Sequence, residues 1–276
     1  MSPKIKYKAL FDLTGKNAIV TGGCGILGEH FCKALSEFGA NVAVVDINED
    51  KAKELASTIQ EEYDTRAIGV YCDVSKPDSV TEMVSKVVGE FVNIHILHNN
   101  AASKSSDLES FFADFEDYSL DEWKKIMSVN IDGMFLVAQA VGKHMVENEI
   151  RGSIVQTSSI YGILASDKRI YGGSHYLGLQ ISNPAVYSTS KAGVVGLTRY
   201  LASYWGEKGI RVNALLPGGV ESGQNDTFKE KYSARVPLAR MAQGYEMTGA
   251  LVYLASDASS YFTGQCVVVD GGLSIW

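Results

Sequence analysis

Apolar and polar positions along this chain follow two alternating patterns. Short apolar runs predict strands, and the longer segments between them place apolar residues at helical spacing. The predicted strands are Asn17–Thr21, Asn41–Asp46, Arg66–Tyr71, Ile94–His98, Ser153–Thr157, Ile210–Leu215 and Cys266–Asp270. The predicted helices are Ile26–Phe38, Glu49–Tyr63, Pro77–Glu90, a long helix from Ser119 to about Asn148, Tyr187–Glu207 and Met247–Ser256. Apolar strands that alternate with helices indicate a parallel sheet covered on both faces, so the pattern predicts an α/β fold with about seven strands.

Some segments interrupt this alternation. Residues 1–13 precede the first strand as an extension, and Ser103–Tyr118 is acidic and aromatic, which predicts a solvated flap. Residues 163–186 form a long polar and aromatic insertion, and we expect it to be a wall or lid over a pocket. The alternative is that this insertion packs on the chain's own body or on a neighbouring subunit. We expect Glu221–Tyr232 to be a mobile substrate loop, and the lack of any linker predicts one domain over residues 1–276.

Composition narrows the class of protein. The chain has 276 residues, of which 46% are hydrophobic and 21% charged, with a net charge of −7. These values argue against a disordered chain, and without a block of basic residues we expect no nucleic-acid partner. The first residues lack the apolar region of a signal peptide, and no apolar run approaches the roughly 18 residues that a membrane helix needs, so we expect a cytoplasmic protein without a membrane partner. Four cysteines without a CxxC pair predict free thiols and no metal site: Cys24, Cys32, Cys72 and Cys266.

The turn between the first strand and the first helix is rich in glycine. It reads Thr21-Gly22-Gly23-Cys24-Gly25-Ile26-Leu27-Gly28. From Gly23 onward it has the form G-x-G-x-x-G in the strand–turn–helix context of a dinucleotide-binding loop. Glycines there let the backbone approach a pyrophosphate, whose charge the helix N-terminus favours. We expect the cofactor to contact Gly22, Gly25, Ile26, Leu27 and Gly28.

Asp46 ends the predicted second strand. An acid at this place accepts hydrogen bonds from the adenosine ribose hydroxyls and repels a 2′-phosphate. No arginine lies within a few residues of Asp46, so the sequence predicts NAD rather than NADP as the cofactor. The alternative is that the glycines form only a tight turn and that Asp46 caps the next helix.

Tyr187 and Lys191 lie four residues apart in a predicted helix, so their side chains share one face. A phenol has a pKa near 10, which is too high for a base at neutral pH, and a nearby ammonium lowers it. Such a pair is a poised proton donor and acceptor, although a tyrosine four residues before a lysine also occurs often by chance on exposed helix surfaces. Ser159 ends the strand region upstream and can donate a hydrogen bond to an oxygen whose charge changes.

These features together resemble the short-chain dehydrogenase/reductase family along nearly the whole chain. The marks are Thr21-Gly22…Gly28, Asp73-Val74, Asn99-Asn100-Ala101, Asn130, Ser159, Tyr187…Lys191, Pro217-Gly218 and Thr263-Gly264-Gln265…Val269-Asp270-Gly271-Gly272. Each mark is weak alone, but their order and spacing are specific. The resemblance implies a doubly wound Rossmann fold and a nicotinamide cofactor, and it implies a homodimer or homotetramer joined through the helices that contain Asn130 and Tyr187.

The resemblance also implies roles for individual residues. Tyr187 becomes the general acid/base, Lys191 also binds the nicotinamide ribose, Asn130 holds the water of a proton relay, and Ser159 is the catalytic serine, with Ser158 as the alternative. The remaining cofactor contacts implied are Asp73 and Val74 at the adenine, Asn100 and Ala101 in the groove, and Pro217, Gly218 and Val220 at the nicotinamide end.

Two departures from the family pattern are present. The commonest glycine pattern, TGxxxGxG, requires glycine at the position of Ile26, and the spacing found, TGxxGxxG, resembles the branch that acts on nucleotide sugars. The C-terminal signature and the short chain favour the simpler oxidoreductase branch. The interval from Ser159 to Tyr187 is also about twice as long as the family usually shows.

The sequence therefore predicts an NAD(H)-dependent oxidoreductase, similar to gluconate 5-dehydrogenase-type members, that interconverts a secondary alcohol and a ketone. The insertion suggests a polar substrate such as a sugar, sugar acid or polyol, with Lys168 or Arg169 pairing with a carboxylate or phosphate. The candidate substrate contacts are Tyr161, Tyr171, His175 and Gln224. The alternatives are 3-oxoacyl-carrier-protein reduction, modification of a nucleotide sugar, and a non-catalytic NAD sensor or scaffold.

Overall fold

Seven parallel strands form one sheet in the order β3-β2-β1-β4-β5-β8-β9. A computed structural model of the chain describes residues 5–105 and 107–276. The strands are β1 (Asn17–Thr21), β2 (Asn41–Asp46), β3 (Ala67–Tyr71), β4 (Ile96–Asn99), β5 (Ser153–Thr157), β8 (Arg211–Pro217) and β9 (Cys266–Val269). The chain builds outward from β1 to β3, returns past β1, and then builds from β4 to β9. Because the order reverses between β1 and β4, a crevice opens at the carboxyl ends of these strands.

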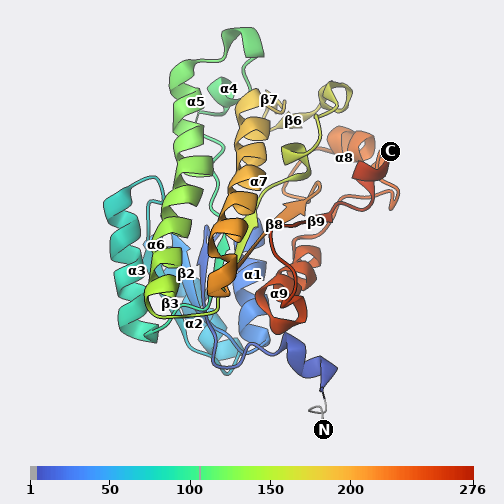
Figure 1. Cartoon of the computed structure of the whole chain (residues 1–276). Helices are drawn as coiled ribbons and strands as arrows, with labels where there is room; N and C mark the ends of the chain where they lie inside the picture. Colours follow the sequence, from blue (N-terminus) through green and yellow to red (C-terminus); the bar gives the residue numbers. More distant parts are fainter. Residues whose placement is uncertain (1–4, 106) are drawn as a thin grey trace.

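Helices cover both faces of the sheet, as the apolar strands predicted (Figure 1). One face packs on α1 (Ile26–Glu37), α2 (Glu49–Glu62) and α9 (Thr248–Ala255). The other face packs on α3 (Pro77–Phe91), α6 (Met134–Glu147) and α7 (Ala185–Trp205). The doubly wound α/β fold with about seven parallel strands is therefore confirmed.

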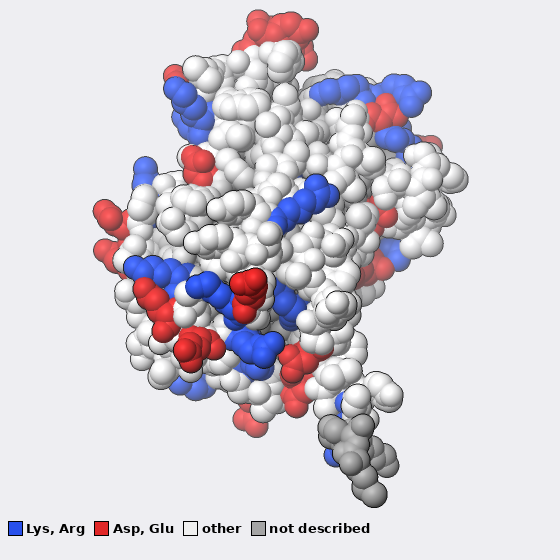
Figure 2. Space-filling model, viewed as in Figure 1, with Lys and Arg blue, Asp and Glu red and all other residues white. Residues whose placement is uncertain are grey.

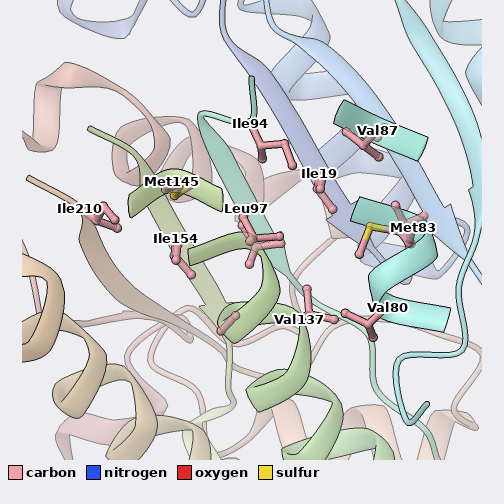
Figure 3. Close-up of a cluster of buried hydrophobic side chains, with 14 of the residues drawn as sticks. Ile19, Val80, Met83, Val87, Ile94, Leu97, Val137, Met145, Ile154 and Ile210 are labelled. Atoms are coloured by element: carbon pink, nitrogen blue, oxygen red, sulfur yellow. The ribbon is translucent and has the colours of Figure 1, made fainter. Parts of the chain in front are cut away.

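Buried aliphatic side chains fill the layer between the sheet and α3, α6 and α7. Figure 3 shows Ile19, Leu97 and Ile154 of three neighbouring strands facing Met83 of α3 and Val137 of α6. All of these side chains are at most 1% exposed. Burial of such a side chain stabilises the fold by about 1.5–3 kcal/mol, so this layer holds the strand ends, and the crevice above them, in place.

The predicted long helix after Ser119 is interrupted. It consists of α5 (Leu120–Met127), a π-helical segment (Ser128–Gly133) and α6. Asn130 is fully buried in the π-helical segment, and a Cβ at Gly133 would come within 2.8 Å of Val74. The wider turn thus presents a buried polar side chain at one position and a close contact with the turn after β3 at another, and π-helical turns of this kind occur frequently at functional sites.

The segment Ser103–Tyr118 is only partly the solvated flap that the sequence predicted. It contains the short helix α4 (Leu108–Phe111), and Phe111 is buried against Ile126 and Val186. The acidic side chains of the segment stay exposed or partly exposed. Its aromatic residues anchor it, and its carboxylates provide the solvated face.

The segment Glu221–Tyr232 was predicted as a mobile loop, and that prediction is wrong for most of it. Residues Asp226–Ser233 form helix α8, which Asn225 caps by accepting a hydrogen bond from the Phe228 backbone at 3.2 Å. Phe228 and Tyr232, four residues apart, bury their rings on one side of this helix. An aromatic pair at this spacing is a helical signal that the polar residues around it obscured.

The insertion of residues 163–186 also has structure. It contains a short 3₁₀-helix, Lys168–Tyr171, and an antiparallel hairpin of β6 (His175–Tyr176) and β7 (Leu179–Gln180). Its Ile170, Tyr171 and Ile181 bury against Phe228 and Tyr232 of α8. Figure 1 shows the hairpin and α8 above the carboxyl ends of β8 and β9. The insertion therefore packs on the chain's own body and stands over the crevice at the same time.

The N-terminal extension joins the core before β1 begins. Residues 1–4, on which the signal-peptide prediction partly rests, lie outside the described residues. Tyr7–Phe11 form an exposed 3₁₀-helix, whereas Leu13 is 1% exposed and packs with α1. In the described part of the chain, no helix is both long enough and apolar enough to cross a membrane. The four cysteines are free, as predicted.

Candidate active site

The glycine turn lies against the end of β4 without room for side chains. Gly22 has a φ of +62°, and a Cβ there would come within 2.9 Å of the Ala101 Cα. A Cβ at Gly28 would overlap the Gly22 carbonyl oxygen and the Gly23 backbone. Gly25 is the N-cap residue of α1, and its amide donates to the Gly22 oxygen at 3.1 Å. These are the close backbone approaches that a pyrophosphate cradle requires, so the turn fits a dinucleotide.

Asp46 lies directly beside this turn. One of its carboxylate oxygens accepts a hydrogen bond from the Cys24 backbone at 3.0 Å, and the other accepts from the Asn48 backbone at 3.0 Å. Asp73 and Val74 follow the neighbouring strand β3, where the Asp73 carboxylate accepts from the Ser75 backbone at 3.0 Å. Asp46, Asp73 and Val74 thus mark the far end of the crevice, away from Tyr187.

The end of β4 is tied to β1 through Thr21. The backbone amides of Asn100 and Ala101 donate to the Thr21 hydroxyl at 2.9 and 3.1 Å, and the Asn100 side chain donates to the Thr21 carbonyl at 3.1 Å. These bonds hold the two sides of the crevice at a fixed separation. Asn100 also lines the cavity that continues from here toward Tyr187.

A cavity of about 280 Å³ joins the glycine turn to the predicted catalytic residues. Its walls include Ile26, Leu27 and Asn100, together with Pro217, Gly218 and Val220 at the carboxyl end of β8. Ser159, Tyr187 and Lys191 form the inner end. Residues predicted separately from the turn, from β8 and from α7 therefore meet in one space.

Helix α7 places Tyr187 and Lys191 on one face, as their spacing predicted. The Lys191 ammonium lies 5.9 Å from the centre of the Tyr187 ring and donates to the Thr157 carbonyl at 3.0 Å. The Ser159 hydroxyl accepts from the Tyr161 backbone at 3.2 Å and lines the same cavity as the Tyr187 phenol. The Ser158 hydroxyl instead donates to the Lys191 carbonyl at 2.7 Å. The Ser158 hydroxyl is thus already used as a donor inside the protein, which favours Ser159 as the catalytic serine, although both serines line the cavity.

Burial is the largest influence on the pKa values of Tyr187 and Lys191. Removal from water raises the pKa of the Tyr187 phenol, and the hydrogen bond from Ser159 opposes that shift only in part. Burial also lowers the pKa of Lys191 to about 8, because the ammonium has no carboxylate beside it. Burial is the largest influence on the Tyr187 phenol and raises its pKa, contrary to the expectation that Lys191 lowers it.

Asn130 lies behind this cluster in the π-helical segment. Its side-chain oxygen accepts from the Ser103 backbone at 2.8 Å, and its amide donates to the Ser103 carbonyl at 3.4 Å and to the Ser190 hydroxyl at 3.5 Å. Asn130 thus connects α7 with the segment that follows β4, close to the cavity wall formed by Asn100 and Ala102. It does not itself line the cavity.

A second cavity of about 210 Å³ opens on the other side of Tyr187. Half of its lining residues are aromatic: besides Tyr187 they are Phe111, Phe112, Tyr161, Tyr171, Tyr176 and Phe228. Of the candidate substrate contacts, Tyr161, Tyr171 and Gln224 line this cavity, although the Gln224 amide bonds within its own loop to Ser222 and Val220. His175 does not join them, because it is exposed on the hairpin and lines neither cavity.

Lys168 and Arg169, which were predicted to contact an anionic group of the substrate, also lie away from the two cavities. Lys168 donates to the Ser182 hydroxyl at 3.0 Å and to the Asn183 carbonyl at 2.9 Å, and Arg169 pairs with Asp167 at 2.7 Å. Both brace the insertion, and neither lines a cavity. The prediction that Lys168 or Arg169 meets the substrate is therefore wrong, because the loop's own acceptors take up both charges.

Sequence reasoning did not single out several residues of the cavity walls, among them Lys104, Ser222 and Phe228. Lys104 and Ser222 line both cavities, and Phe228 lines the second. Lys104 follows the Asn99-Asn100-Ala101 motif closely, so its position near the strand ends was a signal available in the sequence. Ser222 and Phe228 belong to Glu221–Tyr232, which was predicted as a substrate loop without naming either residue. Phe228 is placed by α8, whereas Ser222 precedes that helix.

Comparison with known proteins identifies the family. A family model described as enoyl-(acyl carrier protein) reductase matches residues 25–274. The 3-oxoacyl-(acyl-carrier-protein) reductase of Chlamydia muridarum is 32% identical over 95% of this chain and 98% of its own length. The D-threitol dehydrogenase of Mycolicibacterium smegmatis is 33% identical over 96% and 95%. A solved gluconate 5-dehydrogenase from Burkholderia cenocepacia, in complex with NADP and tartrate, has a TM-score of 0.85 at 31% identity, covering 97% of this chain and 98% of that one.

Fold, motifs and relatives together define an oxidoreductase that binds a nicotinamide cofactor. The chain belongs to the short-chain dehydrogenase/reductase family, which confirms the resemblance drawn from its motifs. The relatives differ in their named substrates, and one solved neighbour holds NADP. Membership in the family therefore leaves the substrate and the choice between NAD and NADP to the residues of this chain.

Proposed function

We propose that the protein is an NAD(H)-dependent dehydrogenase that interconverts a secondary alcohol and a ketone on a sugar, sugar acid or polyol. The observation that carries this proposal is the shared cavity, in which Ser159, Tyr187 and Lys191 face the residues of the glycine turn. A proton-transfer group and a cofactor cradle on one space are what hydride transfer at a hydroxyl carbon requires. The names of the threitol and gluconate dehydrogenases support a hydroxylated substrate.

Tyr187 is the general acid/base in this proposal. It accepts the hydroxyl proton when an alcohol is oxidised and returns it when a ketone is reduced, while Ser159 donates a hydrogen bond to the substrate oxygen. Lys191, held by the Thr157 carbonyl, contributes a positive charge that favours the phenolate. Asn130 anchors the proton relay behind them. The nicotinamide, when bound, supplies or accepts the hydride.

The cofactor would be held along the whole crevice. The glycine turn and Ile26 and Leu27 would contact its pyrophosphate, Asp73 and Val74 its adenine, and Lys191 its nicotinamide ribose. Asn100, Ala101, Pro217, Gly218 and Val220 would complete the groove, and the last three lie at the end of β8, where the nicotinamide would bind. The chain would act as one domain, with residues 163–186 as its inserted substrate wall.

Tyr187→Phe tests the reaction. Removal of the phenolic hydroxyl leaves the ring and its packing, so the fold and cofactor affinity should persist while turnover falls by roughly 10²–10⁴-fold. The measurements are steady-state rates over a panel of sugar acids, polyols and simple alcohols, and a titration of NADH fluorescence. Ordinary turnover in this variant would refute the role of Tyr187.

The preference for NAD rests on Asp46. Its carboxylate lies beside the Cys24 amide of the glycine turn, where a 2′-phosphate would meet a negative charge. Asp46→Ser should raise kcat/KM for NADP relative to NAD by about tenfold or more, an effect of ~1.4 kcal/mol. The solved gluconate 5-dehydrogenase complex contains NADP. If the wild-type form of this protein also prefers NADP, the assignment of NAD is overturned.

Reduction of 3-oxoacyl groups is the second candidate, favoured by the 32% identity to the Chlamydia muridarum reductase. The net charge of −7 and the acidic segment Ser103–Tyr118 speak against docking of an acidic carrier protein. Assays with acetoacetyl-coenzyme A and with sugar acids under the same conditions separate the two candidates. Faster turnover of the acyl compound would replace the first proposal with the second.

We also propose a homodimer or homotetramer joined through the helices around Asn130 and Tyr187. Phe135 of α6 and Tyr200 and Tyr204 of α7 are 47%, 64% and 63% exposed. Figure 2 shows few charged side chains on the upper part of the face that these helices form. Tyr204→Glu should dissociate the assembly, as measured by light scattering, and a wild-type monomer would refute this proposal.

A further inference from the structure

Lys104 occupies the junction of the two cavities. Lys104, Tyr187 and Ser222 are the residues that line both the cavity on the cofactor side and the aromatic cavity on the other side. A molecule whose reacting carbon lies at Tyr187 and whose remainder fills the aromatic cavity must therefore pass beside Lys104. The charges that line the two cavities indicate which kind of substrate group contacts the Lys104 ammonium.

No acidic side chain of the described residues lines either cavity. Two lysines do, and one of them, Lys191, is already held by the Thr157 carbonyl beneath Tyr187. Asp107, the nearest acid along the chain to Lys104, is taken up by the Ser110 hydroxyl and backbone at 2.6 and 3.1 Å. The substrate space is thus positively charged in a protein whose net charge is −7.

The Lys104 ammonium has no hydrogen bond or ion pair with any residue in 5–105 or 107–276. Its one close partner there is the ring of Tyr176, whose centre lies 5.4 Å away on the hairpin of the insertion. The residue is exposed as a whole, yet the protein around the ammonium displaces enough water to lower its pKa. A cation placed over an aromatic ring in a partly dry site, without a counter-charge, is the arrangement that an anionic ligand completes.

We propose that Lys104 binds a carboxylate of the substrate, so that the enzyme acts on a hydroxy acid of the sugar-acid class in preference to a neutral polyol. This inference rests on the proposed function and specifies its substrate. A single ammonium suits a carboxylate, whereas a phosphate group more often collects several donors and an arginine fork. The aromatic rings beyond Lys104 then cover the carbon chain of the substrate.

Matched substrate pairs provide the test. Each pair combines a hydroxy acid with the polyol of the same carbon number: gluconate with glucitol, tartrate with threitol, and glycerate with glycerol. We expect the wild-type enzyme to prefer the acid of a pair. Lys104→Met should lower kcat/KM for the acid by roughly tenfold to a hundredfold, mainly through KM, and change that of the polyol by less than about twofold.

Three controls isolate the charge at this position. Lys104→Arg keeps a cation and should retain most of the preference for the acid. Arg169→Met removes a positive charge from the insertion at a residue that lines neither cavity, and its partner Asp167 keeps a second contact with Arg235 at 3.4 Å. Arg169→Met should leave kcat/KM unchanged for both the acid and the polyol. The NADH dissociation constant should be the same in all variants, since a shift in Lys104→Met would assign Lys104 to the cofactor and overturn the inference.

The outcomes separate this inference from the proposed function. Equal losses on acid and polyol in Lys104→Met, or a wild-type preference for the polyol, overturn the role of Lys104 and leave the dehydrogenase assignment intact. If the wild-type enzyme turns over neither the acid nor the polyol of any pair, the proposed substrate class is refuted. In that case calorimetric titration of tartrate into the enzyme–NADH complex still decides the inference, because binding must be present in the wild type and lost in Lys104→Met.

Discussion

The two ends of the active-site crevice are built in different ways. At the cofactor end, the walls follow the ends of parallel strands, and backbone atoms take part in the contacts: the Gly22 and Ala101 backbones approach closely, and the Cys24 amide donates to the Asp46 carboxylate. At the substrate end, the walls come from Ser103–Tyr118, residues 163–186 and α8, and aromatic side chains make the contacts. The first end is fixed by the sheet, and the second is fixed by side-chain packing between segments outside it.

This difference explains why one scaffold serves many substrates. Strand ends cannot move without disturbing the register of β1, β2 and β4, so the positions that hold the cofactor and Tyr187 are fixed by the fold. The insertion and α8 touch the sheet little and can be exchanged as a unit. We therefore expect damage at one end to leave the other end working, and each of the following predictions tests that separation.

Phe228→Ala should have the largest effect on stability. Phe228 is 7% exposed and packs between Tyr171 and Tyr232, so truncation removes the centre of the contact between α8 and the insertion. The expected cost is about 3 kcal/mol, at the lower end for a buried phenylalanine because the site has a solvent-facing side. Substrate KM should rise at least severalfold, whereas the NADH dissociation constant should not change.

Thermal unfolding, KM measurements and NADH titration check this prediction together. Phe115→Ala is the matched control. Phe115 is 75% exposed on the segment Ser103–Tyr118, so this variant should lose little stability. Weaker NADH binding in Phe228→Ala, comparable to its loss of substrate binding, would show that the two ends are mechanically coupled.

Gly28→Ala should damage the cofactor end instead. A Cβ there overlaps the Gly22 carbonyl and the Gly23 backbone, so α1 must move away from the turn. We expect a loss of about 1–3 kcal/mol in stability and an increase in the NADH dissociation constant of at least about tenfold. Gly89→Ala is the control, because a Cβ on that helical glycine of α3 meets nothing within 4 Å and should stabilise slightly. Unchanged NADH affinity in Gly28→Ala would contradict the cradle.

The same contrast explains what could be predicted from the sequence. Strand and helix positions around the cofactor end follow from periodicity and from glycine at a crowded turn, so Gly22, Gly28 and Asp46 were placed correctly relative to one another. Their geometry depends on the backbone, and the backbone pattern is local in sequence.

The substrate end was predicted less well because its contacts are long-range. Nothing near Lys168 in sequence reveals that Ser182 and Asn183 accept its hydrogen bonds, and nothing near His175 reveals that its hairpin faces solvent. The aromatic pair of α8 becomes a helix by packing on residues of the insertion far away along the chain. The π-helical turn at Asn130 likewise depends on a bond to Ser103 that no periodicity carries.

Lys191 lies beside Tyr187, which lines both cavities, and it allows the smallest and most specific prediction. Burial lowers its pKa to about 8 from an ordinary 10.5, so the folded, unliganded protein loses this proton before the unfolded chain does. Below pH 8 both states hold the proton, and the penalty of a buried ammonium is fully present. Between pH 8 and 10.5 the unfolded chain binds more protons, so stability rises with pH through this group.

The slope should be about 1 kcal/mol per pH unit between roughly pH 8 and 9.5. It is measured as the difference in unfolding free energy between two chains that both carry Tyr187→Phe, so that the neighbouring phenol does not titrate, and of which one also carries Lys191→Met. Other buried tyrosines, such as Tyr161, have raised pKa values and act in the opposite direction at higher pH, but they are present in both chains and cancel. Saturating NADH should change this slope, because the ammonium would then meet the cofactor ribose, whereas a saturating polyol alone should not. A difference that stays flat over this pH range would mean that the Lys191 ammonium is solvated in the free enzyme, and that the junction between the two ends is open to water until the cofactor binds.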